Sequence, residues 1–485
     1  MWLSNYHGII PELYLGTIIV FLLVFGVFYT KIGGKYNKFY KYNYLTILTL
    51  IWTFLIIFVS MPENTLLIGE VNRIEINSLN EGIKGILVLS TLGVLWITWN
   101  SYTQYKINKY EYTLLILLSL LGIFVLVSAK DLLLIYLGVE LISLSLYVMA
   151  SIRRSRAKAT EAGLKYFILG ALSSGVLLFG LAVIYNTLGT TNMLEIKNIG
   201  EMSTEVKIGG MMVIVSMLFK VAAAPLHMWA PDVYEGAPSV VTAYFAIVPK
   251  IGILYVLYEL IFGVFWEIYD PMIRMLIMTT AILSIAIGTF GAINQNRIIR
   301  LLAYSAIVHI GYILLGFSTG TINGILASFV YIIIYIIMSI NIFGLILSIY
   351  RGDEEKYIED IRGLGKQRPV LAITLSLTLL SIAGIPPLAG FLSKFYVMLS
   401  LIEQGQIILA GVAITLSVIG SYYYLKIIKG MYFEESSLIT AAGGTKIRKW
   451  QGILIGITTY MILTLLINPE PVVLLVIDII VNSVV

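Results

Sequence analysis

The fold is decided by residues 211–227, an apolar stretch that contains both a lysine and a proline. They read Met211-Met-Val-Ile-Val-Ser-Met-Leu-Phe-Lys220-Val-Ala-Ala-Ala-Pro225-Leu-His227. A long apolar run is typical of a helix that crosses a lipid bilayer, but proline inside a helix removes a backbone hydrogen bond and clashes with the preceding turn. Broken backbone at membrane depth is tolerated only where protein covers it or where it lines a cavity. The stretch therefore predicts a discontinuous membrane helix, with Lys220 buried close to a break at Pro225.

The composition of the whole chain also indicates a membrane protein. Of its 485 residues, 59% are hydrophobic and 12% are charged, and the mean hydropathy is +0.93. In soluble domains, about 45–50% of the residues are apolar and about 25% are charged. The apolar runs are continuous rather than alternating, so they do not predict a membrane β-barrel. We predict an all-α polytopic membrane protein with about fourteen transmembrane helices. The predicted spans are residues 10–28, 43–61, 83–100, 112–129, 131–150, 164–186, 207–227, 239–262, 271–293, 298–317, 322–349, 370–402 with an interruption, 407–430 and 451–468.

The charges of the loops predict the orientation of the chain. Most of the 32 Lys and Arg residues fall in the odd-numbered loops between spans, and such loops face the cytoplasm or matrix. An even number of spans then places both termini on the opposite side. The first residues lack the positive segment of a secretory signal, so we expect insertion without cleavage. The even-numbered loops are expected to hold Arg73, Lys84, Lys130, Lys197, Lys207 and Arg274.

Five titratable residues lie well inside predicted spans, away from the span ends: Glu140, Lys220, Lys250, His309 and Lys394. An ionisable side chain at the bilayer centre costs at least about 2.5–3.5 kcal/mol on insertion scales, and such residues mark ion or proton pathways. Burial and a neighbouring carboxylate act on a lysine in opposite directions, so a lysine that alternates between such surroundings can load and release a proton. We predict a proton relay. The alternatives are lysines that snorkel to the interface, a static ion pair at Glu140 and a neutral core histidine at His309.

A second broken span, with Pro386 and Pro387 ahead of Lys394, indicates an internal repeat. Discontinuous helices at corresponding positions of two halves are typical of transporters built from inverted repeats. The spacing from Glu140 to Lys220 is 80 residues, and that from His309 to Lys394 is 85. Each half would hold five spans, the fourth to eighth and the ninth to thirteenth. Because five is odd, the second copy is inverted in the membrane.

The repeat predicts four segments along the chain. Residues 1–110 hold the first three spans, residues 111–265 and 266–430 hold one repeat each, and residues 431–485 hold the last span and a tail that we expect at the interface. The chain has no cysteine and three histidines, which excludes thiolate zinc sites and Cys-ligated iron–sulfur clusters. No nucleotide-binding glycine motif links a strand to a helix. We therefore expect no metal and no cofactor bound by this chain.

One stretch carries a resemblance to a known family. Residues 219–238 read Phe219-Lys-Val-Ala-Ala-Ala-Pro-Leu-His-Met-Trp-Ala-Pro-Asp-Val-Tyr-Glu-Gly-Ala-Pro238. This run resembles the core motif of the antiporter-like subunits of proton-pumping NADH:quinone oxidoreductase, respiratory complex I. Its Asp-Val-Tyr-Glu-Gly-Ala-Pro form is similar to the chain 2 (bacterial subunit N) family. Residues 131–147 resemble that family's fifth helix, and the run Gly384-Ile-Pro-Pro-Leu-Ala-Gly-Phe-Leu-Ser-Lys-Phe395 resembles its twelfth.

The resemblance implies fourteen helices, an inverted five-helix repeat and the pumping of one proton per cycle. It implies that Glu140 responds to a neighbouring subunit, that Lys220 is its switching partner and the input site, and that Lys250 is the central connecting lysine. Lys394 would stand near the exit, and His309 falls where the family often has a polar relay residue. NADH, FMN, iron–sulfur clusters and quinone are expected in other subunits.

The resemblance also implies the surroundings of the chain. The expected partners are the other membrane subunits of complex I, including paralogous antiporter-like subunits, and membrane lipids, with no nucleic acid. A stand-alone or Mrp-type cation/proton antiporter subunit and a purely structural spacer are the alternative functions. Richness in Ile, Tyr, Lys and Asn favours an AT-rich genome and the mitochondrial inner membrane, with both termini in the intermembrane space. A bacterial inner membrane and a plastid relative are the alternative locations.

Overall fold

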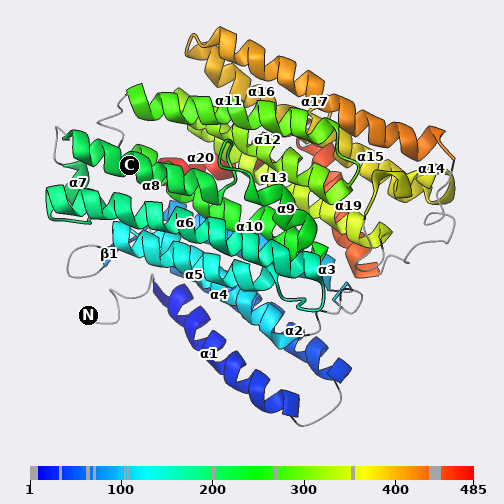
Figure 1. Cartoon of the computed structure of the whole chain (residues 1–485), viewed down its shortest axis with the longest axis horizontal. Coiled ribbons are helices and arrows are strands. Elements are labelled where there is room, and N and C mark those ends of the chain that lie inside the picture. The colour runs from blue at the N-terminus through cyan, green and yellow to red at the C-terminus, as the bar shows by residue number, and fades with distance from the viewer. Residues whose placement is uncertain are drawn as a thin grey trace.

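A computed structural model describes residues 9–31, 35–61, 66–68, 73–99, 101–102, 105, 107, 109–198, 203–265, 271–350, 356–435 and 449–484. In these ranges the chain is built almost entirely from helices that run side by side (Figure 1). Those that coincide with predicted spans are α1 (Ile10–Lys31), α2 (Lys35–Ser60), α3 (Ser78–Thr98), α4 (Tyr110–Ser128), α5 (Leu132–Ala150), α6 (Ala157–Leu188), α8 (Thr204–Lys220), α10 (Ser239–Tyr258), α11 (Pro271–Ile293), α12 (Ile298–Thr319), α13 (Ile322–Ile349), α15 (Pro369–Ala383), α16 (Ala389–Glu403), α17 (Ile407–Phe433) and α19 (Lys449–Thr464).

The remaining elements are short or lie at the ends of the bundle. They are the helices α7 (Met193–Lys197), α9 (Trp229–Gly236), α14 (Leu364–Gln367) and α20 (Glu470–Val484), the π-helical turn η2 (Glu259–Val264), the 3-10 turn η3 (Ile358–Ile361), and the strands β1 (Leu66–Ile68) and β2 (Ile74–Ile76). The two strands form an antiparallel pair in which Leu66 is opposite Ile76. This small sheet was not predicted, and the predicted tail forms the helix α20.

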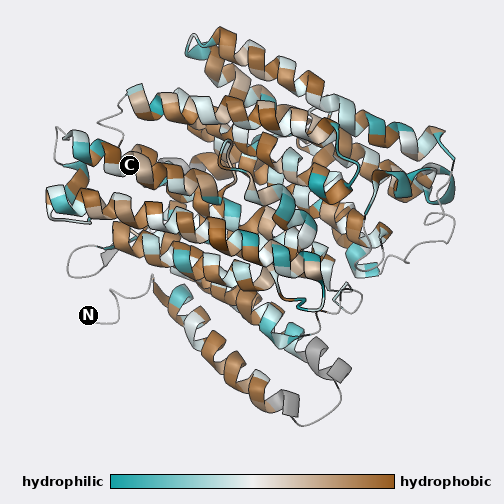
Figure 2. Ribbon diagram, in the orientation of Figure 1, coloured by the Kyte–Doolittle hydropathy of each residue, from teal (hydrophilic) through white to brown (hydrophobic). Residues whose placement is uncertain are grey.

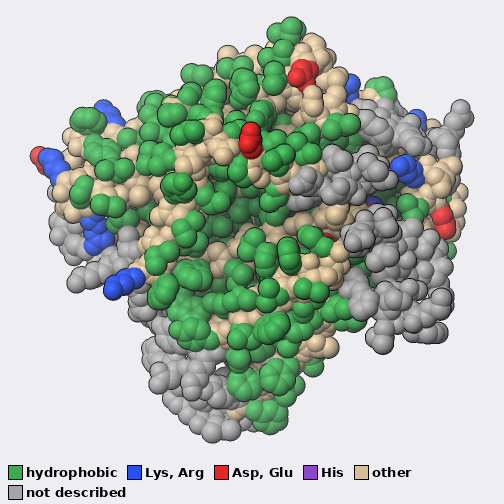
Figure 3. Space-filling view, turned by 180° about the vertical axis from the view of Figure 1, so that it is seen from behind, with side chains coloured by type: hydrophobic (Ala, Val, Ile, Leu, Met, Phe, Trp, Pro, Cys, Tyr) green, Lys and Arg blue, Asp and Glu red, His purple; other side chains and the backbone are tan. Residues whose placement is uncertain are grey.

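Eleven described helical segments are long and apolar enough to cross a membrane. The other three predicted spans fall on α8, on the α15–α16 pair and on α19, which are shorter. Apolar residues dominate the middle of the helices in Figure 2. In Figure 3, apolar side chains cover the centre of the face, while Lys and Arg gather at its two edges. The chain is therefore a predominantly helical, membrane-spanning protein.

Three helices form the centre of the bundle. The apolar window of α10 with η2 is entirely buried inside the chain, and the windows of α12 and α13 are 89% and 94% buried. By contrast, only 28% of the window of α1 is buried. Two of the predicted relay residues, Lys250 on α10 and His309 on α12, therefore lie in the most enclosed part of the chain.

Both predicted helix breaks are confirmed. Helix α8 ends at Lys220, and the chain turns through residues 221–228, with a cis bond before Pro225, until α9 begins at Trp229. Helix α15 ends at Ala383 and α16 begins at Ala389; a cis bond joins the two prolines between them. Gly384 caps α15 with a φ of +85°, a left-handed conformation that glycine adopts without the steric cost of a Cβ atom.

Two sequence-based assignments were wrong. Lys84 does not lie in a loop, because α3 begins at Ser78 and places this lysine in its second turn with a fully buried side chain. The sequence predicts a short acidic loop at Asp232 and Glu235. Both instead belong to the helix α9, and Glu235 pairs with Arg300 at 3.1 Å.

Several expectations fall outside the described residues. They include the odd-loop cations Lys106, Arg351, Lys446 and Arg448, the first eight residues, and residues 266–270, where the second repeat was predicted to begin.

Candidate functional site

Lys220 is held at the end of a helix by neutral groups. It is the last residue of α8 and is 5% exposed; a cation there is favoured by the negative end of the helix dipole. Its Nζ donates hydrogen bonds to Ser143 Oγ at 2.8 Å, Ser174 Oγ at 3.1 Å and Tyr147 OH at 3.4 Å. These partners come from α5 and α6, so the broken helix presents its lysine to the helices beside it.

Glu140 lies on the same face of α5 as two partners of Lys220. Residues 140, 143 and 147 are spaced three and four apart, the spacing that places side chains on one side of a helix. Asp131 caps this helix by accepting a hydrogen bond from the backbone N–H of Leu133. Glu140 is half-buried, and its Oε1 is buried without a hydrogen-bond partner. No lysine in the described part of the chain lies within the 4.0 Å that defines an ion pair with it, although its charge is close enough to act on Lys220.

Lys250 has the least polar surroundings of the three predicted relay lysines. It is 3% exposed, and its Nζ has no hydrogen-bond partner. The Nζ lies 5.4 Å from the centroid of the Tyr234 ring, within the range of a cation–π contact. The ring of Tyr234 is therefore the group that faces the charged form of this lysine.

Aromatic rings connect the surroundings of Lys220 to those of Lys250. The Nζ of Lys220 lies 5.9 Å from the centroid of the Tyr147 ring. The rings then follow one another: the centroid of Tyr147 lies 4.8 Å from that of Tyr166, and the centroid of Tyr166 lies 4.4 Å from that of Trp229. The centroid of Trp229 lies 6.3 Å from that of Tyr234. Helices α5, α6 and α9 supply these rings, so the short helix after the break fills the space between the two lysines.

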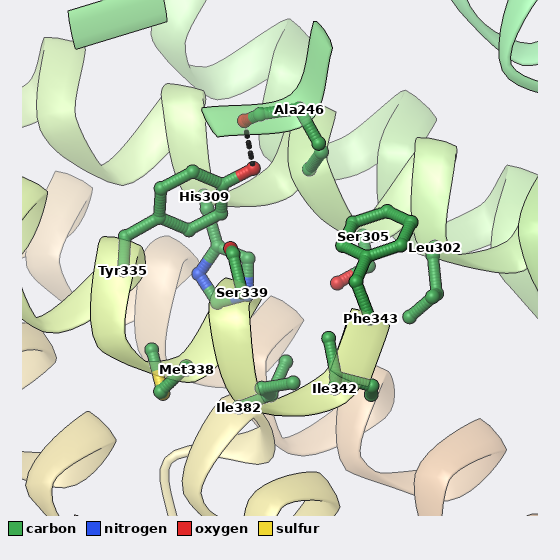
Figure 4. A pocket seen from close by; sticks show the side chains of 11 residues that line it. Ala246, Leu302, Ser305, His309, Tyr335, Met338, Ser339, Ile342, Phe343 and Ile382 are labelled. Carbon is green, nitrogen blue, oxygen red and sulfur yellow. Dashed lines mark hydrogen bonds between the residues drawn. The ribbon is translucent and has the colours of Figure 1, made fainter. Parts of the chain in front are cut away.

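His309 lines a cavity between α10, α12, α13 and α15. Its Nδ1 is 2.8 Å from the hydroxyl of Tyr331. The cavity, of about 20 Å³, has room for about one water molecule. Figure 4 shows His309, Ser305 and Ser339 around it, with the Tyr335 hydroxyl donating to the carbonyl of Ala246 at 3.0 Å. Because Ala246 lies one turn before Lys250 on α10, the cavity adjoins the helix of that lysine.

Lys394 lies at the second helix break, where it bonds a residue next to the cavity lining. Its Nζ donates to the carbonyl of Ala383 at 2.7 Å and to Ser417 Oγ at 2.9 Å. Ala383 directly follows Ile382, which lines the cavity. The Nζ also lies 5.1 Å from the centroid of the Tyr312 ring. The break after α15 thus exposes a backbone carbonyl to a lysine.

The three relay lysines share a kind of environment that the sequence did not reveal. Each faces a tyrosine ring at 5.1–5.9 Å, and none is ion-paired to a carboxylate within the described ranges. Lys356, outside the relay, also faces a tyrosine ring, that of Tyr105 at 4.9 Å. Lys130 differs, because it lies 2.6 Å from Glu259 and 2.8 Å from Glu75. Burial alone would lower the pKa of Lys130, but the two carboxylates outweigh burial and raise it above its ordinary value.

These surroundings define what the arrangement can do chemically. A lysine with neutral partners can lose its proton without leaving an unpaired anion. Glu140 is thus a half-buried titratable group, and Lys220, Lys250, His309 and Lys394 are buried ones, whose surroundings are hydroxyls, aromatic rings and one small cavity. No group of three or more His, Cys, Asp or Glu that could hold a metal occurs among the described residues.

Residues 129–420 match the family that is described as "NADH:quinone oxidoreductase/Mrp antiporter, TM". NADH-ubiquinone oxidoreductase chain 2 of Marchantia polymorpha is 38% identical over 489 residues, covering 97% of each chain. NADH-quinone oxidoreductase subunit N of Pelagibacter ubique is 40% identical over 89% of this chain and 91% of its own. A chain of respiratory complex I from Thermus thermophilus with bound aureothin superimposes with a TM-score of 0.79 at 25% identity, over 96% of this chain and 98% of that one. These similarities span nearly the whole chain, and it belongs to the NADH-quinone oxidoreductase chain 2 (subunit N) family.

Proposed function

We propose that protons cross the membrane through Glu140, Lys220, Lys250, His309 and Lys394 of this chain. The chain acts as the proton-translocating membrane subunit of complex I, and electron transfer from NADH to quinone in other subunits supplies the energy. The observation that carries the proposal is the series of buried lysines that face neutral hydroxyls, a carbonyl and tyrosine rings. Such lysines can change charge repeatedly without breaking an ion pair.

The energetic demand on the relay is modest. Moving one charge against about 100 mV costs about 2.3 kcal/mol. Hydrogen bonds to a charged group contribute about 1.5–3 kcal/mol each, and Lys220 makes three. Gaining or losing one or two of them changes the free energy of the ammonium form by enough to drive or release a proton.

The surface position of α5 supports contact with a neighbouring subunit. Leu133, Leu137 and Leu144 on this helix are 47–54% exposed, so the helix that carries Glu140 lies at the outside of the chain. A charge change in an adjacent membrane subunit would act first on Glu140 and then on Lys220. The partners are the other membrane subunits of complex I, including paralogous antiporter-like subunits, and membrane lipids.

The topology is part of the proposal. The chain has fourteen transmembrane segments, ten of which form an inverted repeat, with α4 to α10 as one half and α11 to α17 as the other. In support, each half contains a titratable group on its second span and a lysine beside the break of its fourth. Both termini face the intermembrane space of a mitochondrion, with a bacterial inner membrane as the alternative location.

The decisive experiment replaces Lys220. In an assembled complex that contains the Lys220→Ala chain, proton pumping per NADH oxidised should fall. The matched control is Lys207→Ala in the first turn of the same helix, which should pump normally. Normal pumping by assembled Lys220→Ala complexes would refute the relay.

Two further outcomes separate the alternatives. The family match includes Mrp antiporters, and an Mrp-type subunit would purify without flavin or iron–sulfur absorbance. A structural spacer would keep pumping when Glu140, Lys220 and Lys394 are all replaced by neutral residues.

A further inference from the structure

A second group of buried charges lies apart from the relay, where α1 and α3 begin. The Nζ of Lys84 on α3 is 2.6 Å from Glu81 Oε1 on the same helix and 2.6 Å from Glu12 Oε1 on α1. The side chains of Lys84 and Glu81 are fully buried, and that of Glu12 is 11% exposed. We name Glu12, Glu81 and Lys84 the α1–α3 triad.

The triad contains two carboxyl groups and one ammonium. If both carboxyl groups were ionised, the triad would carry a net negative charge inside the protein. Two of its carboxylate oxygens, Glu81 Oε2 and Glu12 Oε2, are buried and have no hydrogen-bond partner. The hydroxyl of Ser128 donates to Glu12 Oε1 at 3.1 Å, which leaves both of those oxygens without a donor.

No second described cation forms an ion pair with the triad. Helix α3 packs against α2, α4, α10, α13, α19, α20 and β2, and α1 packs against α2 and α4. Among the described residues, Lys250 on α10 faces the ring of Tyr234. Lys130 pairs with Glu75 at 2.8 Å and with Glu259 at 2.6 Å, and Arg73 pairs with Asp131 at 3.5 Å. The excess negative charge of the triad is therefore not balanced by a described side chain.

Burial decides which form of the triad is stable. A buried charge without a partner is strongly disfavoured, and such a group takes up a proton instead. Two carboxyl groups that share a site resist ionising together. A carboxylate can only accept hydrogen bonds, whereas a protonated carboxyl also donates one. One added proton makes the triad neutral and supplies the missing donor.

We propose that the α1–α3 triad is a proton-binding site in which Glu12 and Glu81 share one proton while Lys84 stays charged. The proton comes from water and binds a carboxylate oxygen, so the net charge of the triad changes from −1 to zero. A metal cation fits the site poorly, since ions such as Ca²⁺ take about 6–8 oxygen ligands and the triad offers two unpartnered oxygens.

A separate cluster of polar side chains begins at Asn80, the residue before Glu81. Asn80 precedes Glu81 on α3 and accepts a hydrogen bond from the Tyr255 hydroxyl. That hydroxyl also contacts Glu259 Oε1 at 3.1 Å. Glu259 pairs with Lys130, and these two side chains are 12–15% exposed.

Infrared spectroscopy of the full chain in lipid nanodiscs at neutral pH tests the site. The wild-type chain should show the carbonyl stretch of a protonated carboxyl group in a dry site. The band should be lost in Glu81→Gln and also in Glu12→Gln, because each variant leaves one carboxylate paired with Lys84. The matched control is Glu205→Gln, an exposed carboxylate in the first turn of α8, which should keep the band.

A third variant keeps the test decisive if Glu81→Gln fails to fold. Lys84→Met removes the cation, so both carboxyl groups should be protonated and the band should grow about twofold. Retention of the full band in Glu12→Gln, or an unchanged band in Lys84→Met, would overturn the proposal. Because the spectrum is taken without electron transfer, the result does not depend on whether the relay pumps protons.

Discussion

Lys220 Nζ lies 2.8 Å from Ser143 Oγ, and Ser143 stands one turn after Glu140 on the same face of α5. The nearest partner of the ammonium is thus a neutral hydroxyl, with the carboxylate one turn farther along the helix. Glu140 can act on Lys220 through its charge without fixing it in an ion pair. This geometry suits a lysine that must release its proton as well as hold it.

Ser143→Ala should impair pumping while assembly stays normal. The change removes a hydrogen bond to a charged group, which contributes about 1.5–3 kcal/mol, so the ammonium form of Lys220 becomes less populated. Pumping per NADH oxidised measures the effect. Ser145→Ala is the matched control, since Ser145 on the same helix bonds only the carbonyl of Leu141. Equal pumping by the two variants would contradict the role of Ser143.

Tyr234→Leu should impair pumping, whereas Tyr234→Phe should leave it near normal. The ring of Tyr234 faces Lys250 at 5.4 Å, and a cation–π contact in a desolvated site contributes up to about 2 kcal/mol. Phenylalanine keeps the ring and leucine does not. The comparison is made on proton pumping in assembled complexes. If the two variants pumped alike, the ring would not support the charged lysine.

Gly390→Ala should destabilise the chain, because α16 passes very close to α15. A Cβ atom at Gly390 would lie 1.8 Å from the carbonyl oxygen of Ser381, and overpacking of a buried contact costs about 1–3 kcal/mol. Gly411→Ala on α17 is the control, since a Cβ there meets nothing within 4 Å and alanine favours a helix by up to about 1 kcal/mol. Chemical unfolding of the full chain in detergent measures the free energy of unfolding of both variants. A Gly390→Ala chain as stable as the wild type would contradict the close approach of α16 to α15.

Lys130→Met should lower the free energy of unfolding by about 3–5 kcal/mol, because it leaves Glu75 and Glu259 buried without their cation. These carboxylates raise the pKa of Lys130. The contribution of Lys130 to the free energy of unfolding is therefore fully present below its pKa in the unfolded chain, about 10.4, and is lost only as the pH rises through its pKa in the folded chain. The loss caused by Lys130→Met should therefore be the same at pH 6 and pH 9.

The control for this variant is Lys426→Met, at an exposed position of α17, which should change the free energy of unfolding little. A large difference between the two pH values in Lys130→Met, or an effect no larger than that of Lys426→Met, would show that the ion pairs do not stabilise the chain.

The helices and their two breaks could be predicted because they follow from local sequence. Apolar length indicates a span, and prolines such as Pro225 and Pro386 interrupt it in any surroundings. The same local reading found Lys220, Lys250 and Lys394, because a lysine in an apolar run is visible without a structure. It did not find Tyr234 or Tyr312 as their partners, since tyrosines are frequent in this chain and nothing local separates a packed ring from one that faces a lysine.

Lys84 shows where local reading failed. The polar first turn of α3 resembles a loop in sequence, and the spacing of Glu81 and Lys84 was the one available sign that both lie on one helix face. Their partner Glu12 comes from the start of α1, and only the packing of α1 near α3 joins them. Contacts between segments so far apart depend on tertiary structure rather than on periodicity.

The neutral partners of the relay lysines have a consequence for the electric field inside the chain. Where a carboxylate accompanies a lysine, most of the field of the pair cancels within a short distance. Around Lys220, Lys250 and Lys394 no such cancellation occurs, so each proton that arrives or leaves changes the local potential by the full effect of one charge. In the proposed relay, each group would therefore sense whether the next one carries a proton, because their like charges repel one another.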